Sequence, residues 1–463
     1  MRQTVSNRTI LQLPKDSRSR TVVRVVTLTT IANCTSGSLT VKRYLTTLVA
    51  VAMFVGLGLT IGCQRAVEPV NDVVEPPPEV PPEDLSALVE GNNQFALDLY
   101  KKLAETEKGN IFFSPYSISS ALAMTYAGAR GQTAEEMAKV LGIAKLGDKV
   151  HPAHASLAYK LKSAGGKDKP EFHIANALWG QQGLPFKPEF LQLTRRHYGA
   201  GFKEVTFEDD TENARSTINK WVGEQTREKI PELLKSKDID GDTKLVLTNA
   251  IYFKADWLHS FRKEDTKDEP FHLTKADRVS VPLMRLNAEL GYANVGDAEL
   301  LEVPYAGRQF SMIVVLPKPD VTMLTLENAL TVDRVNLWLG RMKKRDVRFA
   351  LPRFQGRTAV KLNEELSKMG MANGFTRKAD FSGIVASPKM WIANVVHETF
   401  IAIDERGTEA AAATAVVMRG DGSFIEIPFQ VDRPFLLIIR DTVTGCLLFV
   451  GRVIDPSNIL HKI

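Results

Sequence analysis

The feature that most constrains the fold is a run of small residues, Glu405–Val417, with the sequence ERGTEAAAATAVV. It follows a long apolar run, residues 391–403, and precedes a short polar segment, residues 418–423. Alanine is a strong helix former, so a helix over residues 408–415 is the simplest prediction. Nothing in the run is large enough to anchor a helix face on a core, however.

The same run has the properties of a strand that can join an existing sheet. Alternate residues of a strand face the same side. Here Thr408, Ala410, Ala412 and Thr414 would share one face, and Glu409, Ala411 and Ala413 the other. A strand that enters between two others needs small side chains, no proline and one face that can be buried. The run meets all three conditions.

Residues 396–418, VHETFIAIDERGTEAAAATAVVM, resemble the hinge and reactive-centre loop of the serpins, the serine-protease-inhibitor superfamily. Further motifs extend this resemblance to roughly residues 85–457. It implies an α+β fold with three β-sheets, about eight or nine helices and an exposed reactive-centre loop. It also implies that the hinge of this loop consists of Glu405, Gly407, Thr408, Glu409, Ala410, Ala411, Ala412 and Ala413.

Two further motifs belong to this resemblance. In NIFFSPYSISSALAM, residues 110–124, Ser114 is predicted to cap a helix with Pro115 at its first position. LVLTNAIYF, residues 245–253, is apolar except for two residues, which predicts a strand buried on both faces. A buried Asn249 needs hydrogen-bond partners. The resemblance assigns Ser117, Asn249 and His397 to the shutter beneath the main sheet, and Trp257 to the breach where the loop begins to insert.

Two local patterns make smaller predictions. Thr133 followed by Glu136 has the spacing of a capping box, which predicts a second capped helix start at Thr133. Pro152 between His151 and His154 favours a loop there, and an isolated pair of histidines is typical of a polar surface.

The net charge of +5 is unevenly distributed along the chain. Residues 1–62 hold eight basic residues and one acidic residue, which leaves a formal charge of −2 for residues 63–463. A nucleic-acid partner is therefore not expected. The three cysteines, Cys34, Cys63 and Cys446, have separate contexts, so neither a disulfide framework nor a metal site follows from them.

The sequence of the N-terminal part predicts a targeting segment. Residues 42–62 combine two basic residues with an apolar run and are predicted to be a signal peptide. The position of Cys63 resembles a bacterial lipobox, which implies lipid attachment at Cys63. Thr60 departs from the usual pattern, and a plain signal peptide or a single membrane anchor remains the alternative.

This reading divides the chain into four parts. Residues 1–41 are predicted to be an untranslated or unstructured extension, because a start codon at Val41 would precede the signal. Residues 63–84 are rich in Pro and Glu and are predicted to form a tether, followed by a serpin domain over residues 85–463. The protein is expected to be exported, and either lipid-anchored at the outer membrane or cell surface, or secreted.

The resemblance implies suicide inhibition of a serine-type or cysteine-type endopeptidase by a monomeric protein without cofactor or metal. The alternative is a non-inhibitory serpin-fold module that binds a ligand or client. A hydrolase built on Ser117 and His397 is disfavoured, because no third partner or oxyanion donor is identifiable. No other catalytic motif is present.

Two positions remain open for the scissile bond. The serpin spacing from hinge Glu405 leads to Asp421 and Gly422. Arg419, followed by Gly420, is the basic residue of this window and would suit a trypsin-like protease.

Overall fold

The computed structural model describes residues 77, 79–163, 170–199, 201–408 and 426–457, together with the backbone of 461–462. The helices within these residues are α1 (Pro82–Thr106), α2 (Pro115–Tyr126), α3 (Gly131–Val140), α4 (Val150–Ser163), α5 (Pro188–Tyr198), α6 (Thr211–Gln225), α7 (Met323–Asn328), α8 (Val332–Arg341) and α9 (Asn363–Met369). The strands are β1 (Ile111–Phe113), β2 (Glu171–Gln181), β3 (Phe202–Val205), β4 (Leu245–Asp256), β5 (Lys267–His272), β6 (Arg278–Asn294), β7 (Ala298–Pro304), β8 (Phe310–Pro317), β9 (Lys343–Pro352), β10 (Phe354–Lys361), β11 (Val395–Ile403), β12 (Gly407–Thr408), β13 (Ile427–Gln430), β14 (Phe435–Asp441), β15 (Leu447–Val453) and β16 (His461–Lys462).

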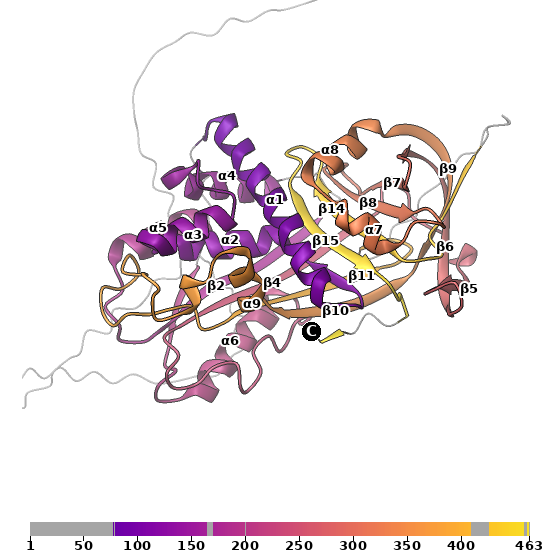
Figure 1. Cartoon of the computed structure of the whole chain (residues 1–463). Coiled ribbons are helices and arrows are strands. Elements are labelled where there is room, and N and C mark those ends of the chain that lie inside the picture. The colour runs from indigo at the N-terminus through magenta and orange to yellow at the C-terminus, as the bar shows by residue number, and fades with distance from the viewer. Residues whose placement is uncertain are drawn as a thin grey trace, which may run out of the picture. The chain divides into compact units, whose positions relative to one another are not determined.

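The described strands form two sheets. The seven-stranded sheet has the order β16-β10-β11-β12-β4-β2-β3. The nine-stranded sheet has the order β1-β15-β14-β8-β7-β6-β9-β13, with β5 beside β6 (Figure 1). Helices cover these sheets, and the predicted α+β serpin fold is confirmed.

Two of the three expected sheets are joined through β6. This strand is 17 residues long. Residues 278–283 of this strand pair with β5 and residues 291–294 pair with β7, while β9 pairs with residues 283–292. One continuous ladder therefore connects the two groups of strands.

The main hydrophobic core lies between the two sheets and the helices around α1 and α2. The apolar face of α1 is buried there, with Phe95, Leu99, Tyr100 and Leu103 shielded from solvent. The helix begins at Pro82, so the last residues of the predicted tether belong to α1. Proline is well tolerated in a first turn, whose N–H groups lack helical partners anyway.

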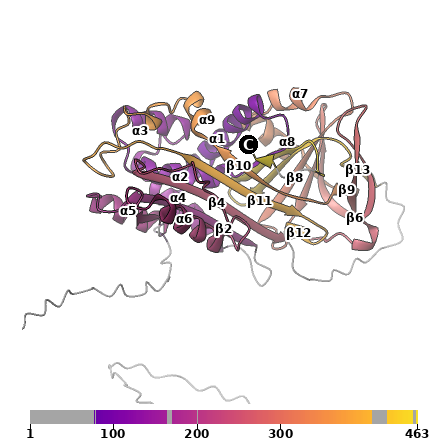
Figure 2. The ribbon, with the colours of Figure 1, turned by 90° about the horizontal axis from the view of Figure 1, so that it is seen from below.

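A second, smaller core lies between α6 and the outer face of the seven-stranded sheet. Ile218 and Val222 of α6 contribute to it, together with Trp179 of β2, Val246 of β4 and Val396 of β11. In Figure 2 this sheet is seen with β4 and β11 side by side and α6 over one part of it. This core thus includes residues from both sides of the β4–β11 junction.

The helix starts were predicted with mixed success. Ser114 is the N-cap of α2, and its Oγ accepts from the N–H of Ser117 as expected. The capping box at Thr133 was wrong, because α3 already begins at Gly131. Thr133 Oγ1 instead accepts the N–H of Asp380, at 2.9 Å, from a distant loop that packs on this helix.

The loop predicted at Pro152 was also wrong. Pro152 lies in the first turn of α4, where its missing N–H removes no helical hydrogen bond. His151 and His154 are therefore helical, and both are buried rather than on a polar surface.

Candidate functional site

The candidate site is the junction between the parallel strands β4 and β11, with β12 at one end. Residues 395–400 of β11 pair directly with residues 247–252 of β4. Beyond that point β12 lies between the two strands: Thr408 pairs with Ile403 on one side and with Ala255 on the other. The first residues of the run of small side chains thus already occupy a place in the sheet (Figure 2).

A tight turn at Asp404 brings the chain from β11 into β12. The Asp404 carboxylate accepts the N–H groups of Arg406, at 2.8 Å, and Gly407, at 3.2 Å. Its own N–H donates to the carbonyl of Gly407, at 2.9 Å. These bonds fix the turn within four residues.

Gly407 has no room for a side chain. A Cβ at this position would collide with the carbonyl oxygen of Ala255 and the Cα of Asp256. Any other residue would push β12 away from β4. The close approach of the two backbones therefore explains the glycine.

Thr408 faces the protein interior and is 1% exposed. Its Oγ1 lies 2.8 Å from the hydroxyl of Tyr305. The Tyr305 ring stacks on Trp257 with centroids 4.6 Å apart, and burial raises the pKa of Tyr305. Thr408 therefore rests on an aromatic pair beneath the sheet.

Trp257 also holds the turn before β12. Its indole N–H donates to the carbonyl of Asp404, at 2.9 Å, and its backbone N–H to that of Arg406, at 2.7 Å. The predicted breach residue thus contacts the segment that leads into β12.

Glu405 carries a buried carboxylate next to this turn. The residue is 2% exposed, and its Oε1 accepts from Thr266 Oγ1, at 2.9 Å, and Arg353 Nη1, at 3.3 Å. The backbone carbonyl of Glu405 accepts the N–H of Phe261, at 2.7 Å. These contacts bind the hinge to the segment between β4 and β5 and to the β9–β10 connection.

The predicted shutter residues meet at the middle of the β4–β11 junction. His397 and Asn249 are direct register partners, and both are 0% exposed. His397 Nε2 accepts the N–H of Ser114, at 3.0 Å, so the ring proton must lie on Nδ1. Nδ1 then donates to the side-chain oxygen of Asn249. Burial lowers the pKa of His397 to about 3, which keeps the ring neutral.

Ser117 completes the polar network on the other side of Asn249. The Asn249 amide donates to Ser117 Oγ, at 2.8 Å, and to the side-chain oxygen of Asn176, at 2.6 Å. The Asn176 amide donates in turn to the carbonyl of Ser117, at 3.0 Å. Every polar group of this buried network therefore has a partner, as burial requires.

This arrangement does not form a serine–histidine catalytic pair. Ser117 Oγ bonds to the two asparagines, whereas both ring nitrogens of His397 are used by Ser114 and Asn249. Neither side chain reaches solvent. The network is suited to holding strands together rather than to attacking a substrate.

The segment after α6 forms a clamp over the same junction. The buried carboxylate of Asp238 pairs with Lys361 Nζ of β10, at 2.6 Å. Asn394 donates to the Asp238 carbonyl, at 2.5 Å, and Lys229 lies over the ring of Phe400 in β11. This segment thus connects α6 to the β10–β11 half of the sheet.

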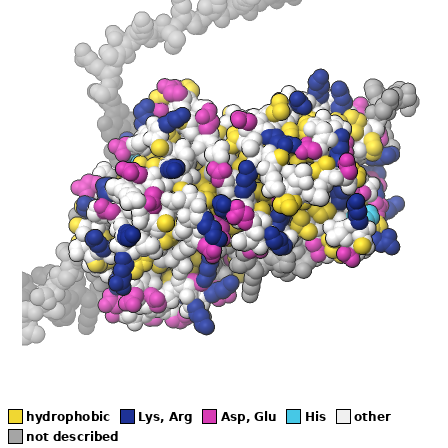
Figure 3. Space-filling view, viewed as in Figure 1, with side chains coloured by type: hydrophobic (Ala, Val, Ile, Leu, Met, Phe, Trp, Pro, Cys, Tyr) yellow, Lys and Arg dark blue, Asp and Glu magenta, His cyan; other side chains and the backbone are white. Residues whose placement is uncertain are grey.

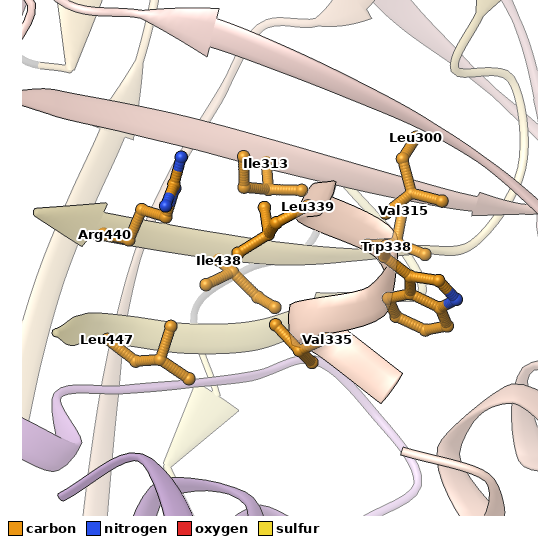
Figure 4. A pocket seen from close by; sticks show the side chains of 9 residues that line it. All are labelled: Leu300, Ile313, Val315, Val335, Trp338, Leu339, Ile438, Arg440 and Leu447. Carbon is orange, nitrogen blue, oxygen red and sulfur yellow. The ribbon is translucent and has the colours of Figure 1, made fainter. Parts of the chain in front are cut away.

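A small apolar pocket lies elsewhere, between α8 and strands of the nine-stranded sheet (Figure 4). Trp338 and Leu339 of α8 close one side of it. Arg440 lines its edge and donates to Glu302, at 2.9 Å. The pocket contains none of the hinge, breach or shutter residues.

Several predicted site residues lie outside the described residues. They are Glu409, Ala410, Ala411, Ala412 and Ala413 of the hinge, Arg419, Gly420, Asp421 and Gly422 of the scissile region, and Cys63. Within the part of the chain that is described, no group of His, Cys, Asp or Glu side chains is arranged to hold a metal ion. No helix in the same part is long and apolar enough to cross a membrane.

Other residues of the site were not predicted. Asp404 could have been found, because Asp three residues before Gly is typical of a tight turn. Tyr305, Thr266, Arg353 and Asn176 come from distant strands and loops, and nothing in their local sequence marks them. Only the fold brings them to the hinge and shutter.

The fold and the site together define a class of protein in which a short strand, β12, parts one end of two paired parallel strands of the main sheet. The sequence pattern of the family described as Serpin (serine protease inhibitor) matches residues 90–456. The chain belongs to the serpin family, as its loop motif predicted.

Known relatives cover most of the chain. It is 39% identical over 382 residues to the leukocyte elastase inhibitor of Homo sapiens, which covers 80% of this chain and 100% of that protein. It is 37% identical over 429 residues to an uncharacterised serpin-like protein of Thermococcus kodakarensis, which covers 89% of this chain and 99% of that protein.

Solved structures give the same picture. Uncleaved ovalbumin matches with a TM-score of 0.74 and 30% identity, over 80% of this chain and 100% of that chain. The thermophilic serpin Tengpin, in its native state, matches with a TM-score of 0.72 and 29% identity, over 79% of this chain and 94% of that chain.

Proposed function

We propose that this protein is a suicide inhibitor of serine-type endopeptidases and acts as a monomer. The observation that carries the proposal is the position of β12. Thr408, at the head of the run of small residues, is buried between β4 and β11, while the junction below it is still closed. β12 is thus the first part of a strand that can lengthen between β4 and β11.

The mechanism follows from this geometry. A protease cleaves the loop and is held as an acyl-enzyme, which frees the loop to extend β12 along the junction, a form of β-strand addition. Each added residue must separate one register pair, starting next to Phe400 and Tyr252. The bond between His397 and Asn249 breaks when the new strand passes between them.

The gain on insertion comes from a sheet that takes up a further strand, whose side chains are small enough to fit between β4 and β11 once these have parted. Serpin loop insertion is a known case of strain release. The acyl-enzyme is dragged along with the loop, and its active site is distorted before water can release it. A cysteine-type endopeptidase forms the same kind of acyl-enzyme and is therefore a second target class.

Incubation with a panel of serine and cysteine proteases tests the proposal. We expect a complex that resists SDS and whose intact mass identifies the new carboxyl terminus at Arg419 or at Asp421. Arg419→Ala should abolish complexes with trypsin-like enzymes if the chain is cut after Arg419. Cleavage of the loop by every protease without any stable complex would favour a non-inhibitory binding module.

We further propose that the protein is exported and carries a lipid on Cys63. The support is the order of basic residues, apolar run and cysteine in residues 42–63. Metabolic labelling with a fatty-acid analogue should mark the parent and not Cys63→Ala. An unlabelled parent that is cleaved like an ordinary secreted protein would exclude the anchor.

A further inference from the structure

A dense group of positive charge lies where the chain passes from α8 into β9. Five exposed basic side chains form this basic cluster: Arg341, Lys343, Lys344, Arg345 and Arg348. One acidic residue, Asp346, falls among them. Figure 3 shows Lys and Arg side chains gathered along this edge of the molecule. Residues 63–463 as a whole carry a formal charge of −2, so the cluster is a local exception.

The basic cluster has no ion-pair partner among the described residues, although Arg345 donates to the carbonyl of Lys344, at 3.1 Å. None of its five side chains forms an ion pair with another described side chain. Residues 343–346 are exposed on both faces of the strand, whereas Val347 and Phe349 are buried. Like charges this close repel one another, so these side chains do not stabilise β9 through ion pairs.

The basic cluster lies beside one anchor of the reactive loop. β13, which follows the loop, runs parallel to β9 and begins at Ile427 opposite Val347. Lys343–Arg345 therefore lie immediately before the point where the loop rejoins the sheet. Two acids of these strands, Asp346 and Glu289, face each other as cross-strand partners, and Glu426, just before β13, accepts from the side-chain amide of Asn287, at 3.3 Å.

The positive field also reaches toward the other anchor. Burial lowers the pKa of His259, and the charges of Arg308 and Lys344 lower it further, so both cations lie close to this ring. His259 precedes Phe261, whose N–H binds the carbonyl of Glu405 in the hinge. Arg308 and Lys344 thus add positive charge near the segment that binds the hinge.

We propose that the basic cluster is a docking surface for the acidic face of the target protease. This inference rests on the proposed function, because a protease that attacks the loop must bring its own surface over the strands that anchor the loop. An acidic protease would be steered toward the loop by this field. Electrostatic steering of this kind raises association rates by about 10 to 10³-fold and weakens steeply with salt. A sulfated polysaccharide shares the required charge but would not need to lie beside the loop.

Two trypsins of one specificity and opposite charge, anionic and cationic trypsin, are suitable probes. The test variant carries Lys343→Glu, Lys344→Glu and Arg345→Glu. The control carries Lys139→Glu, Lys145→Glu and Lys220→Glu, three exposed lysines elsewhere that give the same change in net charge. The rate constant for formation of the SDS-stable complex is measured at low and at high salt. A milder variant, Lys343→Ala with Lys344→Ala, guards against a folding defect.

With anionic trypsin at low salt, the test variant should react at least about tenfold more slowly than the parent, and the control less than about twofold. The difference should vanish at high salt, and cationic trypsin should show no loss. Equal slowing of test variant and control, or slowing that salt does not change, would overturn the docking surface while leaving inhibition intact. Acceleration by heparin without any difference between the two trypsins would assign the cluster to a polysaccharide instead. A parent that forms no complex with either trypsin would refute inhibition of trypsin-like enzymes, and the docking surface with it.

Discussion

The β4–β11 junction and the β14–β15 hairpin are both central strand pairs, but they are held together in different ways. The hairpin strands are almost entirely apolar and buried. β14 is paired on both edges, with β15 and with β8. The junction instead has a polar bond at its middle, between His397 and Asn249, and one end already parted by β12.

The polar contacts of the hairpin and of the junction also differ. At the hairpin, Asn93 accepts the N–H of Leu447, at 2.9 Å, and donates to the carbonyl of Gly445, at 2.9 Å. A buried ion pair joins Arg452 to Glu327, at 2.7 Å. These contacts tie the hairpin to α1 and α7. The shutter network also reaches other elements, through Ser114, Ser117 and Asn176, but its central bond, between His397 and Asn249, crosses the junction itself. One region is built to stay closed and the other to open.

The sharpest way to break this comparison is Thr408→Arg. The variant must bury a guanidinium without a partner next to Tyr305, which raises the free energy of the inserted strand by about several kcal/mol. We expect the loop still to be cut, but with no SDS-stable complex and with little gain in heat stability after cleavage. Thr408→Ser keeps the size and the hydroxyl and should trap protease like the parent. Equal trapping by Thr408→Arg would exclude insertion as the mechanism.

The hairpin should respond through stability instead. Arg452→Leu leaves the buried carboxylate of Glu327 with only the hydroxyl of Tyr100, at 2.5 Å. Removing one partner of a buried ion pair costs about 3–5 kcal/mol in the free energy of unfolding. Urea unfolding of the uncleaved protein measures this loss. Lys102→Ala, which removes an exposed pair with Glu105, should change it by less than about 1 kcal/mol.

Acid should destabilise the protein through buried histidines. Burial lowers the pKa of His397 and of His154 to about 3, and that of His151 to about 4. The unfolded chain takes up these protons near pH 6.5. The free energy of unfolding should therefore be at its full value above pH 6.5. It should fall as the pH decreases toward these folded pKa values, by on the order of 1 kcal/mol per pH unit for each histidine.

One variant tests the contribution of His154 alone to this pH dependence of stability. His154 packs near Tyr198 at the interface of α4 and α5, and its Nδ1 has no partner among the described residues. His154→Leu should reduce the slope of stability against pH by one proton between about pH 4 and 6. An unchanged slope would mean that His154 does not titrate on unfolding.

The smallest effect is expected at the clamp over the junction. Lys361→Met removes the partner of Asp238 on the β10–β11 side. Lys361 is about half exposed, so we expect a loss of about 1 kcal/mol or less and a severalfold faster spontaneous loss of inhibitory activity on warming. Lys368→Met, in the exposed pair with Glu364 on α9, should leave the half-life unchanged.

The sequence predicted the elements of the two regions better than their contacts. The apolar run predicted the buried strand β4. Asn249 within this strand indicated a polar network, because a buried amide needs hydrogen-bond partners. Its partner Asn176 could not be identified, because the order of polar and apolar residues in β2 does not indicate which polar side chain faces Asn249. The pairing is set by the register of β2 on β4, which local sequence does not encode.

The hinge shows the same limit. Gly407 and Thr408 were predicted from the loop motif, and the structure places both between β4 and β11. The contacts of Glu405 with Thr266 and Arg353 join segments 139 and 52 residues away. The prediction of a capping box at Thr133 was wrong for a related reason. The Thr133 hydroxyl accepts the N–H of Asp380 from a distant loop, so it is not used for a local cap.

The position of β15 has a consequence for how the chain is made. This strand lies between β14 and β1, and Arg452 of β15 pairs with Ile111 of β1. A ribosome must therefore finish nearly the whole chain before β1 can find its neighbour. Until then β1 and β8 present open edges, which are the surfaces most prone to join another nascent copy. The molecule thus completes the sheet that stays closed only at the end of synthesis, through contacts of very long sequence separation that form slowly.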